Sequence, residues 1–140
     1  MATLAPAPAA STAAPVWAGR APTTLFALFM LGASIAPKLL GMAVATETIE
    51  ALGWPPSHVP MIGLVELTFL LLYLIPRTSV LGAVLMTALL GGAMATHIRV
   101  GSPLLSHVLF SIYLALFMWG GLWLRSPALR AVFPLMIAKD

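Results

Sequence analysis

The sequence is short of two kinds of residue, and each shortage excludes a class of function. It contains no cysteine, so disulfide bonds, thiol redox chemistry and thiolate metal sites are excluded from this chain. Only 8% of its 140 residues are charged, and its seven Lys and Arg are scattered instead of forming a run, which argues against a nucleic-acid-binding surface. The sequence also lacks a GxSxG motif, a glycine-rich phosphate loop and a Ser/His/Asp order.

Apolar residues dominate the composition. They make up 61% of the chain, and the mean hydropathy is +1.03. A soluble domain would need more polar residues to cover its surface, so the composition indicates a membrane protein. Four apolar segments are each close to the roughly 20 residues that cross a bilayer. They cover residues 23–44, 59–75, 79–96 and 104–124, and they are separated by breakers at 53–60, 76–79 and 99–103.

These segments predict an all-α fold, an integral membrane antiparallel four-helix bundle. Helices are required because an unpaired backbone is not tolerated in lipid. We expect a flexible Ala/Pro-rich tail over residues 1–22, a transmembrane domain over 23–124 and a cytoplasmic interfacial tail over 125–140. The third segment should pack closely on its neighbours through small residues spaced four apart, namely Ala88 with Gly92 and Gly91 with Ala95, together with Gly82.

The orientation follows from the basic residues at the ends of the segments. With four crossings, both termini lie on one side of the membrane. That side collects Arg20, Arg77, Arg125, Arg130 and Lys139, against Lys38 and Arg99 on the other. The positive-inside rule therefore predicts that both termini lie in the cytoplasm. The expected location is the bacterial inner (plasma) membrane, with the chain as a multi-pass protein.

A lysine inside the first apolar segment is the most unusual feature of the sequence. Lys38 follows Pro37, which should bend the helix just before the lysine and free a carbonyl for a polar partner. Glu66 lies at comparable depth in the second segment, which starts from the membrane face where the first one ends. Lys38 and Glu66 are therefore the expected ion pair.

Further polar side chains fall in the same layer of the expected bundle. His97 ends the third segment, His107 begins the fourth, and Arg99 lies in the short loop region between them. Ser34 shares the helix face of Lys38, and Tyr73 shares the face of Glu66. We expect these seven residues to form a ligand-binding site, with Glu66 and His97 as candidate catalytic residues: Ser34, Lys38, Glu66, Tyr73, His97, Arg99 and His107.

Plainer interpretations of the same residues exist. Lys38 and Glu66 can form a structural ion pair that locks helix register, and either histidine alone is more often an interfacial residue without a chemical role. The combination of these groups in one layer is what favours a binding site. No HxxxH or ExxH spacing is present, so no metal site is expected.

The sequence resembles the DoxX-like family of small four-helix membrane proteins from about Thr23 to Pro134. The resemblance rests on Ser34 with Lys38–Leu39, LGWPP at 52–56, IGLVEL at 62–67, LIPR at 74–77, ATHIRVGSPL at 95–104 and SHVLF at 106–110. It implies an integral membrane protein, and the family's name comes from association with a terminal quinol oxidase or thiosulfate:quinone oxidoreductase. Other relatives are linked to oxidative-stress membrane complexes.

Three functions stay open from the sequence. The first is a polar intramembrane pocket that binds a lipophilic small molecule, a quinone, within a membrane redox system. Lys38 or His107 would donate to a carbonyl oxygen, and electrons would come from a partner subunit because the chain has no recognisable carrier motif of its own. The second is a non-catalytic scaffold subunit of a membrane complex. The third is a cofactor-free acid/base enzyme acting on a lipid-soluble substrate through Glu66 and His97.

Overall fold

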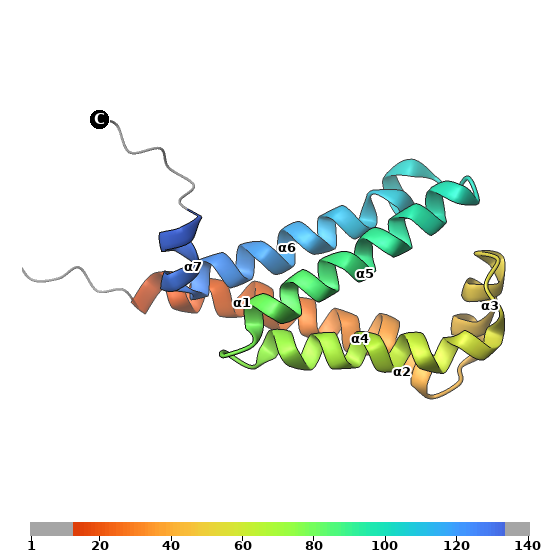
Figure 1. Ribbon diagram of the computed structural model, residues 1–140, viewed down its shortest axis with the longest axis horizontal. Helices are drawn as coiled ribbons and strands as arrows, with labels where there is room; N and C mark the ends of the chain where they lie inside the picture. Colours follow the sequence, from red (N-terminus) through yellow and green to blue (C-terminus); the bar gives the residue numbers. More distant parts are fainter. Residues whose placement is uncertain (1–12, 134–140) are drawn as a thin grey trace, which may run out of the picture.

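A computed structural model describes residues 13–133, and every regular element in that range is a helix (Figure 1). Four helical stretches are long and apolar enough to cross a membrane: Trp17–Leu39, Pro56–Leu74, Ser79–Arg99 and Leu104–Arg125. The predicted all-α membrane bundle is thereby confirmed. The elements are α1 (Ala13–Phe29), the π-helix η1 (Met30–Ile35), α2 (Ala36–Leu39), α3 (Ala43–Ala51), the 3₁₀ turn η2 (Pro56–His58), α4 (Val59–Leu74), α5 (Ser79–Arg99), the π-helix η3 (Leu104–Val108), α6 (Phe110–Arg125) and α7 (Pro127–Val132).

The first span lies earlier in the chain than the sequence predicts. It begins inside the expected tail, because residues 13–22 already belong to α1, while residues 1–12 fall outside the described range. A Cβ added at Gly19 would lie 2.7 Å from the Gly121 carbonyl oxygen, so these glycines let α1 pack closely on α6 and support its extension. The same span ends at Leu39, not at Val44, because Gly41 takes a left-handed φ of +65°.

The third span is longer than expected, since α5 continues to Arg99 and includes both His97 and Arg99. The tail after α6 forms the short helix α7 up to Val132. The Ser126 hydroxyl caps α7 by accepting a hydrogen bond from the Leu129 backbone N–H at 3.2 Å. Its expected position along the cytoplasmic interface stays a prediction, and residues 134–140 lie outside the described part of the chain.

The helices pack as α1 on α6, α4 on α5, and α5 on α6, with η1 and α2 lying against α4. Among the described glycines, Gly82 makes the closest approach to another helix, since a Cβ there would lie 2.1 Å from the backbone nitrogen of Tyr73. The expected close packing further along α5 is not found within the chain. Added Cβ atoms at Gly91 and Gly92 would meet nothing within 4 Å, and Ala88 and Ala95 are exposed.

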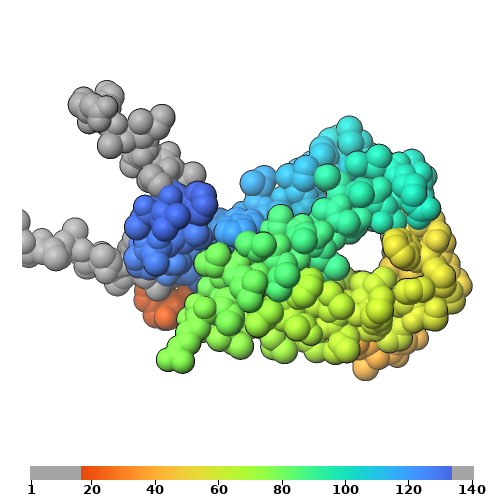
Figure 2. All heavy atoms as spheres, in the orientation of Figure 1, coloured from red at the N-terminus to blue at the C-terminus, as the bar shows by residue number. Residues whose placement is uncertain are grey.

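At the end opposite α7, the bundle divides into two arms (Figure 1). The η1–α2 rod runs with α4, while α5 runs with α6. The short helix α3 lies across the ends and has a small core of its own, made by Ala45, Ile49 and Val59. Figure 2 shows an opening through the molecule between α3, α4 and α5. A hydrogen bond from Arg99 Nη2 to the Leu52 carbonyl at 2.5 Å connects the two arms at this end.

Candidate functional site

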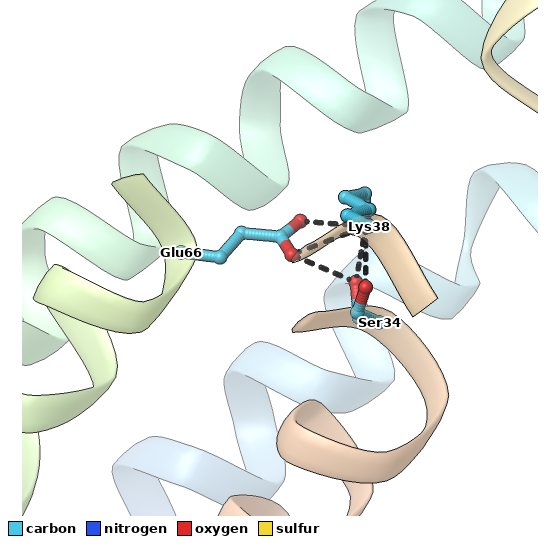
Figure 3. A network of polar contacts seen from close by, with 3 residues as sticks. All are labelled: Ser34, Lys38 and Glu66. Carbon is cyan, nitrogen blue, oxygen red and sulfur yellow. Dashed lines mark hydrogen bonds and ion pairs between the residues drawn. The ribbon is translucent and has the colours of Figure 1, made fainter. Parts of the chain in front are cut away.

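The centre of the site is an ion pair between two helices of one arm. Lys38 Nζ of α2 lies 3.1 Å from Glu66 Oε2 and 3.2 Å from Glu66 Oε1 of α4 (Figure 3). The two side chains are only 13% and 9% exposed, and neither would be so enclosed without a partner. The structure thus places the ammonium beside the carboxylate, as the sequence predicts.

Ser34 joins this pair and closes a three-residue network. Its hydroxyl donates to Glu66 Oε2 at 3.0 Å and accepts from Lys38 Nζ at 2.6 Å, while the Ser34 carbonyl accepts from the same ammonium at 3.2 Å. An ammonium has three N–H donors, and here four acceptor atoms surround it. A ligand oxygen that replaced one of these acceptors would therefore find a donor already in position.

The local backbone explains why Lys38 points at Glu66. Pro37 has no N–H to donate, and the turn before it widens into the π-helix η1, in which the Ala36 N–H bonds to the Leu31 carbonyl five residues back. The predicted bend before Lys38 is therefore a π-helical turn. Gly63 of α4 lets the two helices touch, since a Cβ there would lie 2.9 Å from the Lys38 Cβ. The absence of a side chain at Gly63 is therefore what permits this close contact between α2 and α4.

The two histidines form a second polar group on the other arm. The rings of His97 and His107 lie 5.5 Å apart between centroids at an interplanar angle of 61°. Each Nδ1 atom has a serine partner, at 3.0 Å to Ser102 Oγ for His97 and 2.8 Å to Ser106 Oγ for His107. Both serines were missed, although the run RVGSPLLSH places them beside the histidines in the sequence.

No hydrogen bond or ion pair within residues 13–133 joins the histidine pair to the Lys38–Glu66 network. The single polar layer expected from the sequence is therefore divided between the two arms. The pairing of Glu66 with His97 that an acid/base enzyme would need has no direct contact to support it. Arg99 follows His97 by two residues in α5, but within the described residues it has no hydrogen bond or ion pair with either group; its side chain is exposed and bonded to the Leu52 carbonyl.

Tyr73 was expected in the ligand site but serves the core of the bundle. Its side chain is fully buried, and its hydroxyl donates to the Met118 carbonyl at 2.9 Å and lies 3.3 Å from Thr23 Oγ1. It is seven residues from Glu66 along α4, or about 10 Å at the rise of an α-helix. Its polar atom is already satisfied there, so it links α4 with α1 and α6.

Within residues 13–133, no group of three or more His, Cys, Asp or Glu side chains could hold a metal ion. The two polar groups of the candidate site are the ammonium and carboxylate of one arm and the two imidazoles of the other. Both are suited to hydrogen bonding and proton transfer.

Four apolar helices, with a Lys–Glu pair enclosed between two of them, define a multi-pass helical membrane protein. The model of the DoxX-like family matches residues 21–121, most of the chain, and the chain belongs to this family. Comparison with curated proteins and with solved structures gave no match.

Proposed function

We propose that the Ser34–Lys38–Glu66 network binds the polar head group of a lipophilic molecule, a quinone, as part of a membrane redox system. The observation that carries this proposal is a charged donor and acceptor held together among apolar helices. Ionisable groups at membrane depth are costly and commonly mark a ligand or proton pathway. The Lys38 side chain is 13% exposed, so the protein does not enclose it completely.

The chemistry of the network fits a quinone carbonyl. Lys38 Nζ would donate to the carbonyl oxygen in place of its present bond to the Ser34 hydroxyl, and Glu66 would keep the ammonium oriented. The carboxylate of Glu66 can also accept a proton when the ligand is a reduced quinol. Reduction of the quinone would take two electrons from a redox centre in a partner subunit, and oxidation of the quinol would pass two electrons back to that centre. In the inner membrane, with both termini in the cytoplasm, this network would lie toward the non-cytoplasmic side.

Native mass spectrometry of the protein purified in mild detergent tests this proposal. We expect the wild-type protein to retain a quinone, and the variants Lys38→Met and Glu66→Gln to lose it. Thr68→Ala is a matched control, because Thr68 lies on α4 close to Glu66 but is exposed and bonded to the Leu64 carbonyl. Equal retention by all variants, or no quinone in the wild-type protein after purification with added quinone, would contradict the proposal.

The exposed small residues of α5 favour a second candidate function, that of a scaffold subunit. Ala88, Gly91, Gly92 and Ala95 are exposed within the chain, and small residues spaced four apart are typical of helix contacts in membranes. A scaffold should keep its co-purifying subunits in Lys38→Met and lose them in Gly92→Leu. If the protein instead binds a quinone, Lys38→Met should lose the quinone and Gly92→Leu should retain it.

A further inference from the structure

A groove of about 360 Å³ runs between α5 and α6, away from the Lys38–Glu66 network. Its volume lies in the range of known ligand sites, and its lining is almost entirely apolar. Gly91 opens it on the α5 side, since a Cβ there would meet nothing within 4 Å. At one end, the Trp119 indole N–H donates to Thr87 Oγ1 at 2.9 Å. The indole N–H is therefore already bonded, and this part of the groove suits a hydrocarbon chain.

The opposite end of the groove leads to the histidine pair. Met94 lines the groove on α5 and precedes His97 by three residues, while Ser111 lines it on the other side and follows His107 by four. These separations are about one helical turn, so both imidazoles lie just beyond the apolar lining. His107 is exposed and His97 is half-buried, so a ligand at this end can reach them.

The two imidazole rings can each offer a ring N–H as a hydrogen-bond donor to a ligand. Each Nδ1 lies within hydrogen-bonding distance of a serine hydroxyl, and in the tautomer in which that hydroxyl donates to Nδ1 the ring proton is on Nε2. Neither Nε2 atom takes part in a hydrogen bond in the described part of the chain. Because the two rings lie only 5.5 Å apart between centroids, their Nε2–H groups can together bind one cluster of head-group oxygens.

The charge around this end of the groove selects the kind of head group. The sequence has no Asp or Glu between Glu66 and Asp140, so α5, η3 and α6 carry no negative side chain. Arg99 follows His97 by two residues, and its guanidinium, which is bonded to the Leu52 carbonyl, adds positive charge at this end of the bundle. We infer that the α5–α6 groove binds one acyl chain of an anionic phospholipid, whose phosphate accepts hydrogen bonds from His97 and His107. This site is separate from the proposed quinone site and does not depend on it.

Fluorescence quenching by brominated lipids tests the inference. A protein with Trp119 as its only tryptophan is made by Trp17→Phe, Trp54→Phe and Trp123→Phe and reconstituted into vesicles. The vesicles contain phosphatidylglycerol or phosphatidylcholine with identical dibrominated chains. We expect apparent affinity for phosphatidylglycerol to be roughly tenfold higher, the contribution of one charged hydrogen bond. Gly91→Leu should abolish this preference by filling the groove. Gly92→Leu, an equally open glycine that does not line it, should leave the preference unchanged.

A second pair of variants separates the head group from the chain. His97→Gln combined with His107→Gln should remove the preference for phosphatidylglycerol while quenching by phosphatidylcholine stays the same. Equal quenching by both lipids in the parent protein would overturn the inference, as would equal preference in Gly91→Leu and Gly92→Leu. Quenching that is relieved by added quinone would assign the groove to a quinone tail and overturn it as well. Quinone retention at Lys38 is measured separately, so failure here leaves that proposal intact.

Discussion

Removing the ammonium of Lys38 should destabilise the fold far more than removing the whole ion pair. In Lys38→Met, the Glu66 carboxylate stays 9% exposed with only the Ser34 hydroxyl as a partner. Breaking a buried pair by deleting one partner costs about 3–5 kcal/mol, because an uncompensated charge is left behind. Replacing both partners by apolar residues of similar volume is about neutral. The double variant Lys38→Met with Glu66→Met should therefore recover most of the loss.

Thermal unfolding in detergent, followed by circular dichroism, measures this prediction. At this chain length, about 3 kcal/mol corresponds to a drop in Tm of roughly 10 °C. The double-mutant cycle should give a coupling free energy above about 2 kcal/mol. A single variant that unfolds within about 2 °C of the wild-type protein, together with a coupling near zero, would refute the reasoning. It would mean that water or lipid head groups solvate the carboxylate as well as Lys38 does.

Three further predictions follow from the packing and the topology. Gly82→Ala should destabilise the protein by more than about 2 kcal/mol in thermal unfolding, because its Cβ would overlap the backbone of Tyr73, whereas Gly92→Ala should be neutral or slightly stabilising. Tyr73→Phe should cost about 1–2 kcal/mol in the same assay and leave quinone retention unchanged, since the phenol is bonded within the core. Because the chain has no cysteine, Ser57→Cys and Ser126→Cys can be labelled singly in intact cells. We expect a membrane-impermeant maleimide to label the first and not the second, and the opposite result would reverse the proposed orientation.

The sequence alone was enough to predict the class of fold and the central contact of the site. Four long apolar segments have one stable solution in a bilayer, since each must satisfy its own backbone hydrogen bonds as a helix. Lys38 and Glu66 then had to lie at similar depth, because an antiparallel hairpin of spans fixes height by residue count. Neither the helical fold nor the depth of these two residues depends on which helix faces which neighbour.

What the sequence could not decide is how the helices pack around their axes and where they separate. The sequence places His97 and His107 at the same depth as Lys38, but depth does not determine lateral position. In the structure the histidines lie on one arm and the Lys38–Glu66 pair lies on the other. Tyr73 shares a helix face with Glu66, yet the Met118 carbonyl, distant in sequence, accepts its hydroxyl. Height in the membrane follows from local periodicity and chain length. Lateral neighbours depend on contacts such as Gly19 of α1 against Gly121 of α6, which are distant in sequence and form only once the first and last spans are packed together.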